Sequence, residues 1–199
     1  MDKHYSLTET AGLIRKALKE AFPDTKFSVT TKRYAGGSSI TVSYTDGPLT
    51  KTVDAIIGSF EGIGFDGTTD STVYYKARSF RGEQATFNYG YISVTRSVSD
   101  VLLQIAAYRV HKETKLPLLT VKNNSFIGGE YSTAFFYDKD LDVFTRGEDS
   151  ACSGEWYSQL VMQVAWNTAP PHKRGHTCLP TVIDPLLHEL KYDSSVVSN

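Results

Sequence analysis

Three aspartates in glycine-containing stretches are the first residues that could carry chemistry. Asp46 precedes Gly47 and Pro48, and Asp66 and Asp70 lie in the stretch from Phe65 to Asp70. Carboxylates are preferred ligands of Mg²⁺, which assists phosphodiester cleavage. Asp beside Gly is equally typical of tight turns. Because no Glu, His or Lys stands at a defining spacing, we interpret these aspartates as turn residues, with a metal-dependent nuclease or hydrolase as an alternative.

A second set of possible metal ligands lies toward the C-terminus. Its members are Cys152, His172, His176 and Cys178. The spacing His-x-x-x-His-x-Cys would put three zinc ligands in one loop, but the paired cysteines of common zinc sites are absent. The neighbouring Lys173 and Arg174 favour a solvated basic loop, so we predict no metal and no cofactor. Cys178 and His188 could formally make a nucleophile and base, but nothing in the sequence brings them together.

A glycine pair, Gly36-Gly37, stands between two strand-like runs. A phosphate-binding loop is followed directly by a helix, whereas here the apolar residues alternate with polar ones, as in a strand. Glycine supplies the positive φ angles of a hairpin turn, so we predict a β-hairpin. The group Lys32-Arg33-Tyr34 before this turn is our preferred contact surface.

Basic and aromatic side chains suit binding to another macromolecule, because they bury large areas with few rotamers to freeze. We predict partner-binding residues at Lys32, Arg33, Tyr34, Arg78, Arg81, Lys173 and Arg174. The same side chains can stack on the bases of single strands, so nucleic acid is an alternative partner.

Composition narrows the classes of function. The chain has 199 residues, 21 of them basic and 22 acidic, so it has neither a basic field for DNA nor the acidity of a DNA mimic. No stretch approaches the ~20 apolar residues of a membrane span. The first residues lack the apolar core of a secretory signal, so we expect a cytoplasmic protein with free thiols and no membrane partner.

The apolar periodicity predicts helices and strands in the first part of the chain. A helix should begin at Ser6, where Glu9 completes a capping box, and end at Pro23. A second helix should run from Pro48 to about Gly62, and a third from Ser97 to before Pro117. Further antiparallel strands are expected at 73–75, 85–87 and 91–94.

After Pro117 the pattern changes to two strands, a third short strand and a helix. We expect strands at 118–121 and 131–136 joined to each other, a strand at 141–144, a helix at 155–165 and a short element at 182–190. The sequence thus predicts an α+β fold with an antiparallel sheet packed against amphipathic helices. We expect a module at 1–114 and an α+β extension at 115–199, either separate or packed on the module.

Five separated motifs, in the same order, resemble the large polyvalent protein-associated domain family twenty-nine over residues from about 5 to 110. They are Leu13–Pro23, Lys26–Val29, Tyr34–Ile40, Thr45–Pro48 and Phe65–Asp70. The resemblance implies a small α+β module found in proteins of plasmids, prophages and phages, beside anti-restriction and DNA-processing proteins. It implies no catalytic residues.

The sequence therefore favours a non-enzymatic accessory protein of a mobile genetic element. We expect an anti-defence inhibitor, of the anti-CRISPR or anti-restriction type, that binds and occludes a host or defence protein in the bacterial cytoplasm. The alternatives are a nucleic-acid-binding protein of phage or plasmid DNA processing and the metal-dependent hydrolase named above.

Overall fold

The computed structural model describes residues 3–80, 83–88, 90–147 and 155–170. Its contacts divide the chain into two compact units, unit 1 ending at Ser97 and unit 2 beginning at Val98. We describe each unit by itself. Among the helices so described, none is both long and apolar enough to cross a lipid bilayer.

Helix α1 (Leu7–Ala21) confirms the first predicted helix. The Glu9 carboxylate accepts hydrogen bonds from the backbone N–H of Ser6 at 2.8 Å and from its hydroxyl at 2.7 Å. These bonds lower the pKa of Glu9 and hold the start of the helix. The helix ends before Pro23, which cannot continue it.

The central sheet of unit 1 has the order β2-β3-β8, where β2 is Ser28–Tyr34, β3 is Gly37–Thr45 and β8 is Tyr91–Ser97. The predicted hairpin is confirmed: β2 and β3 are antiparallel, and Gly36 in the turn has φ of 89°. The prediction that 91–94 is an antiparallel strand is wrong, because β8 pairs with β3 in parallel. A parallel neighbour requires a long crossover, which residues 46–90 provide.

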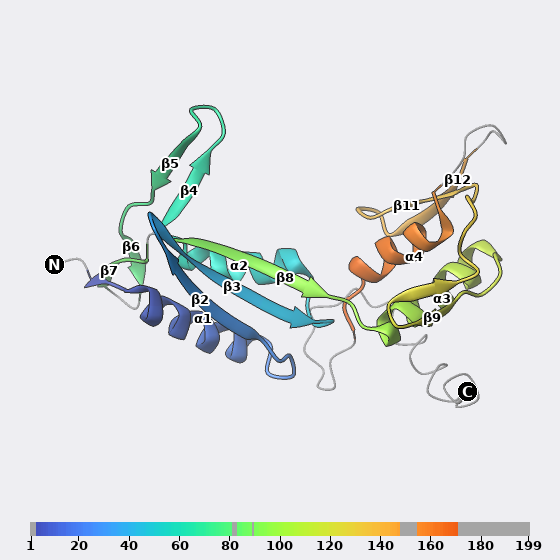
Figure 1. The fold of residues 1–199 in the computed structure, drawn as a ribbon, viewed down its shortest axis with the longest axis horizontal. Coiled ribbons are helices and arrows are strands. Elements are labelled where there is room, and N and C mark those ends of the chain that lie inside the picture. The colour runs from blue at the N-terminus through green and yellow to red at the C-terminus, as the bar shows by residue number, and fades with distance from the viewer. Residues whose placement is uncertain (1–2, 81–82, 89, 148–154, 171–199) are drawn as a thin grey trace. The chain divides into compact units, whose positions relative to one another are not determined.

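The core of unit 1 lies between this sheet and two helices. Helix α1 contacts β2 and β3, and α2 (Thr50–Ile57) contacts β8 before the chain continues into the 3-10 turn η1 (Gly58–Phe60). Figure 1 shows both helices beside the sheet. The buried apolar residues are Leu7, Ala11, Ile14, Leu18, Phe22, Val29, Ile40, Val42, Tyr44, Val53, Ile57, Phe60, Ala85 and Phe87.

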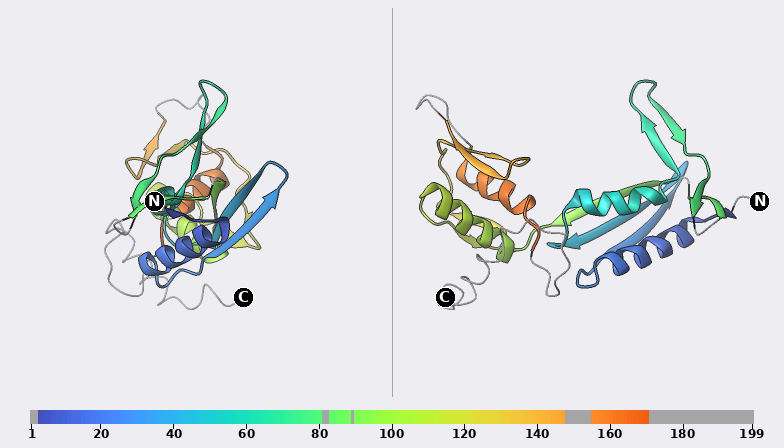
Figure 2. Two further views of the ribbon diagram at one scale, coloured as in Figure 1. Left: turned by 90° about the vertical axis from the view of Figure 1, so that its left-hand side faces the viewer. Right: turned by 180° about the vertical axis from the view of Figure 1, so that it is seen from behind.

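Five short strands complete unit 1. β7 (Glu83–Thr86) lies between β6 (Arg78–Phe80), to which it is antiparallel, and β1 (Lys3–His4), to which it is parallel. β4 (Ile63–Asp66) and β5 (Ser71–Tyr74) form a two-stranded hairpin of their own. Figures 1 and 2 show this β4–β5 hairpin projecting from the rest of unit 1.

Unit 2 is built around two helices, α3 (Asp100–Thr114) and α4 (Tyr157–Trp166), which pack on each other. The predicted helix at 155–165 is confirmed as α4. The third predicted helix begins later than Ser97, because the Ser99 hydroxyl caps it by accepting from the N–H of Leu102 at 3.3 Å. Because α3 packs on α4, both helices belong to unit 2.

The strands of unit 2 form two hairpins, which corrects the predicted pairing of 118–121 with 131–136. β9 (Thr120–Lys122) pairs with β10 (Ser125–Ile127), and β11 (Phe135–Asp138) pairs with β12 (Val143–Arg146). Asn123 and Asn124 both have positive φ, which makes a tight turn directly after β9. The Asp100 carboxylate accepts from both of their N–H groups, at 2.8 and 2.7 Å.

Two large apolar side chains of the unit 2 helices are exposed. Trp156 is the N-cap residue of α4, and Val101 lies on the open side of α3. The short element predicted at 182–190 lies outside the described residues. Both units combine helices with small sheets, so the predicted α+β class is confirmed.

Candidate functional site

The β4–β5 hairpin exposes an unusual amount of apolar surface. Tyr74 is 66% exposed and lies opposite Ile63, and Phe65 is 62% exposed and lies opposite Thr72, so these four residues share one face. Val73, on the other face, is 41% exposed. A two-stranded sheet with little burial contributes little stability by itself. Exposed apolar patches of this kind commonly mark interaction sites.

The turn of this hairpin contains two of the candidate metal ligands. The Asp66 carboxylate accepts from the N–H of Thr68 at 2.9 Å and from the hydroxyl of Thr69 at 2.8 Å. These two hydrogen bonds lower the pKa of Asp66. Asp70 has φ of 50°, a turn conformation. The structure thus gives Asp66 the role of a turn residue, as the sequence indicated.

Asp46 lies in another turn, directly after the end of β3. It has φ of 57°, and its backbone carbonyl accepts from Nε of Arg96 at 2.7 Å. Among the described residues, no three His, Cys, Asp or Glu side chains form a group that could hold a metal ion. The structure therefore does not bring Asp46, Asp66 and Asp70 together.

The open face of the central sheet carries a second surface, which we call the tyrosine–lysine patch: Lys32, Tyr34, Ser39 and Tyr91. The register places Lys32, Ser39 and Tyr91 in one row across the three strands. A Cβ on Gly37 would lie 3.0 Å from the Tyr34 ring, so this ring lies over Gly37. Tyr34 is 47% exposed and Tyr91 is 46% exposed.

The structure separates most of the predicted partner-binding residues. Lys32 and Tyr34 share a face, but Arg33 points to the other side of the strand because side chains alternate. Arg78 begins β6, in a different sheet. The other predicted ligands and contacts lie outside the described residues: Arg81, Cys152, His172, Lys173, Arg174, His176, Cys178 and His188. Tyr91 was missed, since only the parallel register of β8 places it in the same row as Lys32, with Ser39 between them.

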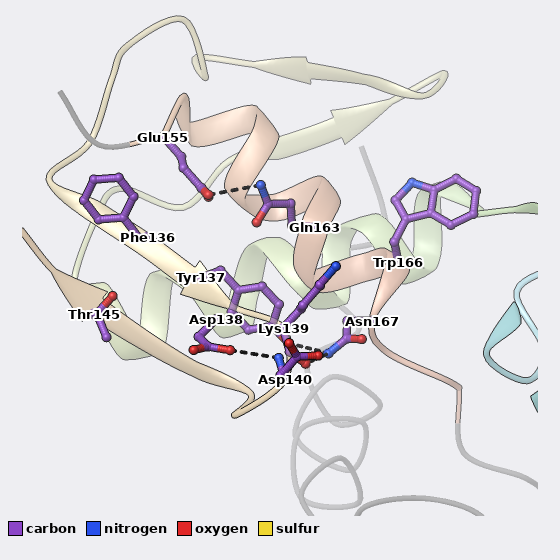
Figure 3. A pocket seen from close by; sticks show the side chains of 10 residues that line it. All are labelled: Phe136, Tyr137, Asp138, Lys139, Asp140, Thr145, Glu155, Gln163, Trp166 and Asn167. Carbon is purple, nitrogen blue, oxygen red and sulfur yellow. Dashed lines mark hydrogen bonds between the residues drawn. The ribbon is translucent and has the colours of Figure 1, made fainter. Parts of the chain in front are cut away.

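Unit 2 contains a pocket of about 820 Å³ between α4, β11 and the turn that follows β11. Figure 3 shows Glu155 and Gln163 along one side, Asp138 and Asp140 along the other, and Phe136 and Trp166 at opposite ends. The lining residues are Phe136, Tyr137, Asp138, Lys139, Asp140, Thr145, Glu155, Gln163, Trp166 and Asn167. Sequence reasoning did not find this pocket, because its residues come from β11, the turn after it, β12 and α4, which share no motif.

Polar side chains hold the floor of this pocket in place. The Tyr137 hydroxyl donates to the Asp142 carboxylate and accepts from the side-chain amide of Asn167 at 3.0 Å. Arg109 binds the same carboxylate at 2.9 Å. Burial, followed by the hydrogen bond to Asp142, raises the pKa of Tyr137 to about 12. Tyr137 is therefore protonated at neutral pH and acts as a fixed hydrogen-bonding group.

Comparison with known proteins identifies the first part of the chain. The family described as large polyvalent protein associated domain 29 matches residues 5–99, which confirms the resemblance for the segment from α1 to β8. This match associates the segment with polyvalent proteins of phages and other mobile elements. The comparisons with curated proteins and with solved structures gave no match.

Proposed function

We propose that this protein, whose residues 5–99 match the large polyvalent protein associated domain 29, is a mobile-element accessory protein that binds a bacterial host or defence protein. It acts in the bacterial cytoplasm as an inhibitor of the anti-CRISPR or anti-restriction type. Its mechanism is occlusion: the β4–β5 hairpin covers a functional surface of the target.

The exposed apolar residues of the β4–β5 hairpin carry this proposal. Phe65 and Tyr74 lie on one face of the β4–β5 hairpin, which contributes little to the core. Their exposed rings therefore do little to stabilise the fold. Aromatic anchors of this kind dominate the binding energy of protein interfaces when they fill pockets of a partner. The apolar face of the central sheet, by contrast, is buried against α1 and α2.

Charge favours a protein over a nucleic acid as the partner of this hairpin. The formal net charge of the chain is −1, and two of its acidic residues, Asp66 and Asp70, lie in the hairpin turn. Phosphate backbones bind surfaces that carry several Lys or Arg side chains, and carboxylates beside the contact would repel them. An apolar hairpin with an acidic tip is better suited to an apolar and basic surface on a protein.

Replacing both Phe65 and Tyr74 with Ser should abolish capture of the target. These side chains are exposed, so the change in the free energy of unfolding should stay within about 0.5 kcal/mol. The experiment uses the full-length tagged protein as bait in bacterial lysate, with mass spectrometry of the retained proteins. The purified target should then bind the double variant at least about tenfold more weakly, because two anchors are lost.

The control for this experiment is the pair Val101→Ser and Leu141→Ser in unit 2. These side chains are 69% and 71% exposed, so the control removes similar apolar surface elsewhere. Capture of the same target by the wild type, the control and the hairpin variant would contradict the proposal.

Single-stranded nucleic acid is a second candidate partner, favoured by the tyrosine–lysine patch. Two exposed rings on a sheet face can stack on bases while Lys32 contacts a phosphate. If this function operates, Tyr34→Ala with Tyr91→Ala should weaken binding of an oligonucleotide by about tenfold or more, given about 1–3 kcal/mol per stacked base. Fluorescence anisotropy at several salt concentrations measures this. Affinity that is absent at physiological salt, or unchanged in the variant, would exclude the patch as such a site.

A further inference from the structure

We propose that the pocket of unit 2 binds the guanidinium group of an arginine side chain in a peptide segment of a partner protein. This inference goes beyond the proposed function, because it concerns residues outside the matched domain and does not depend on the β4–β5 hairpin. Three properties of the pocket carry it: an unsatisfied acceptor, an excess of carboxylates and aromatic ends.

The unsatisfied acceptor is the Glu155 carboxylate. Its Oε1 accepts from the side-chain amide of Gln163 at 3.1 Å, whereas its Oε2 is buried and has no hydrogen-bond partner among the described residues. A buried acceptor without a donor costs free energy, and a carboxylate oxygen costs more than a neutral one. Gln163 fixes the carboxylate in the wall of the pocket. Because this oxygen is buried, a ligand donor reaches it only if the side chains that cover it move aside, and the new hydrogen bond then removes this cost.

The charge of the lining indicates that this ligand is a cation. Asp138, Asp140 and Glu155 place three carboxylates around the pocket, against the single ammonium group of Lys139. Asp138 accepts from the backbone N–H groups of Asp140 and Leu141, but within the described part of the chain no ion pair joins a cation to any of the three carboxylates. A neutral ligand such as a sugar could donate a hydrogen bond to a carboxylate, but it would leave the negative charge of the three carboxylates uncompensated.

The aromatic ends favour a guanidinium group over an ammonium group. Phe136 and Trp166 line opposite ends of the pocket and are 36% and 42% exposed, so part of each ring faces solvent (Figure 3). Guanidinium is planar, is weakly hydrated and stacks on aromatic rings while its edge donates to a carboxylate. Ammonium is a strongly hydrated point charge that gains less in such a site.

The size of the pocket indicates that the arginine belongs to a peptide. A volume of about 820 Å³ is of the size that holds drug-sized ligands. One guanidinium group with its stem fills only part of this space. The amide nitrogens of Gln163 and Asn167 donate within the pocket, to Glu155 and to Tyr137 and the Lys139 carbonyl, and their amide oxygens can accept from backbone N–H groups that flank an arginine residue.

The test is a titration of the full-length protein with short synthetic peptides. In a Trp156→Phe background, Trp166 is the only tryptophan of the chain and reports on the pocket. The probes are acetyl-Gly-Arg-Gly-amide and the same peptide with citrulline, which keeps the shape of arginine but is neutral. The arginine peptide should change the Trp166 fluorescence and bind at least about tenfold more tightly than the citrulline peptide, because a charge-assisted hydrogen bond is lost.

The variant Glu155→Gln should weaken binding of the arginine peptide by about tenfold or more, since the charged acceptor is removed. Glu130→Gln, an exposed position of unit 2 outside the pocket lining, makes the same change in charge and should leave binding unchanged. Equal affinity for the two peptides would overturn the proposal, and this comparison needs no variant of Glu155. If the β4–β5 hairpin captures no target, the peptide titration is unaffected. The proposal for the pocket can therefore be contradicted independently of the proposed function.

Discussion

Replacing Phe87 with Ala should lower the free energy of unfolding of unit 1 by about 3–5 kcal/mol. Phe87 is 2% exposed and lies at the centre of an aromatic cluster. Its ring centroid is 5.5 Å from that of Tyr5, 5.4 Å from that of Phe60 and 5.4 Å from that of Phe80. Alanine would remove the contacts with all three rings and leave a cavity that the surrounding strands cannot fill.

The measurement for Phe87→Ala is urea unfolding followed by circular dichroism, with hydrogen exchange of unit 1 amides to localise the loss. Phe65→Ala makes the same chemical change at a side chain that is 62% exposed, and it should alter the free energy of unfolding by less than about 0.5 kcal/mol. Similar effects of the two substitutions would show that Phe87 does not belong to the core. A small effect at Phe65 would confirm that its side chain does not support the core.

Local interactions explain which parts of the fold could be predicted from the sequence. The start of α1 depends on Ser6 and Glu9, which are three residues apart, and its end depends on the adjacent Pro23. The turn between β2 and β3 depends on Gly36 alone. Each of these patterns contains the groups that form the structure, so each was predicted correctly.

The errors arise where pairing depends on distant residues or on turn conformation. Tyr91 lies beside Ser39 across the parallel ladder, and no local pattern distinguishes a parallel strand from an antiparallel one. The predicted strand pairing in unit 2 was wrong because the positive φ angles of Asn123 and Asn124 make a tight turn directly after β9, so β9 pairs with β10. A pair of asparagines between two apolar runs is a hairpin signal that could have been used.

The candidate sites show the same contrast between local patterns, which the sequence predicts, and arrangements of distant residues, which it does not. The Asp66 turn was predicted because its donors, Thr68 and Thr69, follow within three residues. The pocket of unit 2 combines Phe136 from β11, Glu155 before α4 and Trp166 at the end of α4. In the sequence the residues of α4 indicate only an amphipathic helix with a buried face. The packing of β11 against α4 determines which polar residues beside that face line a pocket.

The second large effect concerns Arg96, a buried cation at the end of the central sheet. Arg96 is 3% exposed, and its Nε donates to the backbone carbonyl of Asp46 at 2.7 Å. Burial lowers the pKa of Arg96, and the neighbouring Tyr44 and Asp46 oppose this shift. The N–H of Asp46 also donates to the carbonyl of Ser97 at 2.7 Å, so the turn after β3 is held to β8 from both sides.

Replacing Arg96 with Met should therefore lower the free energy of unfolding by about 2–3 kcal/mol, because a charge-assisted hydrogen bond is lost and the Asp46 carbonyl is left without that donor. Methionine keeps most of the volume, so the loss comes from the polar contacts rather than from a cavity. Arg33→Met on the exposed part of β2 is the matched control and should change stability by less than about 0.5 kcal/mol. Urea unfolding of both variants measures the difference. Equal stabilities would mean that the buried guanidinium does not hold the turn. The variant Arg96→Lys separates the effect of charge from that of geometry, because an ammonium cannot reproduce the planar donor arrangement.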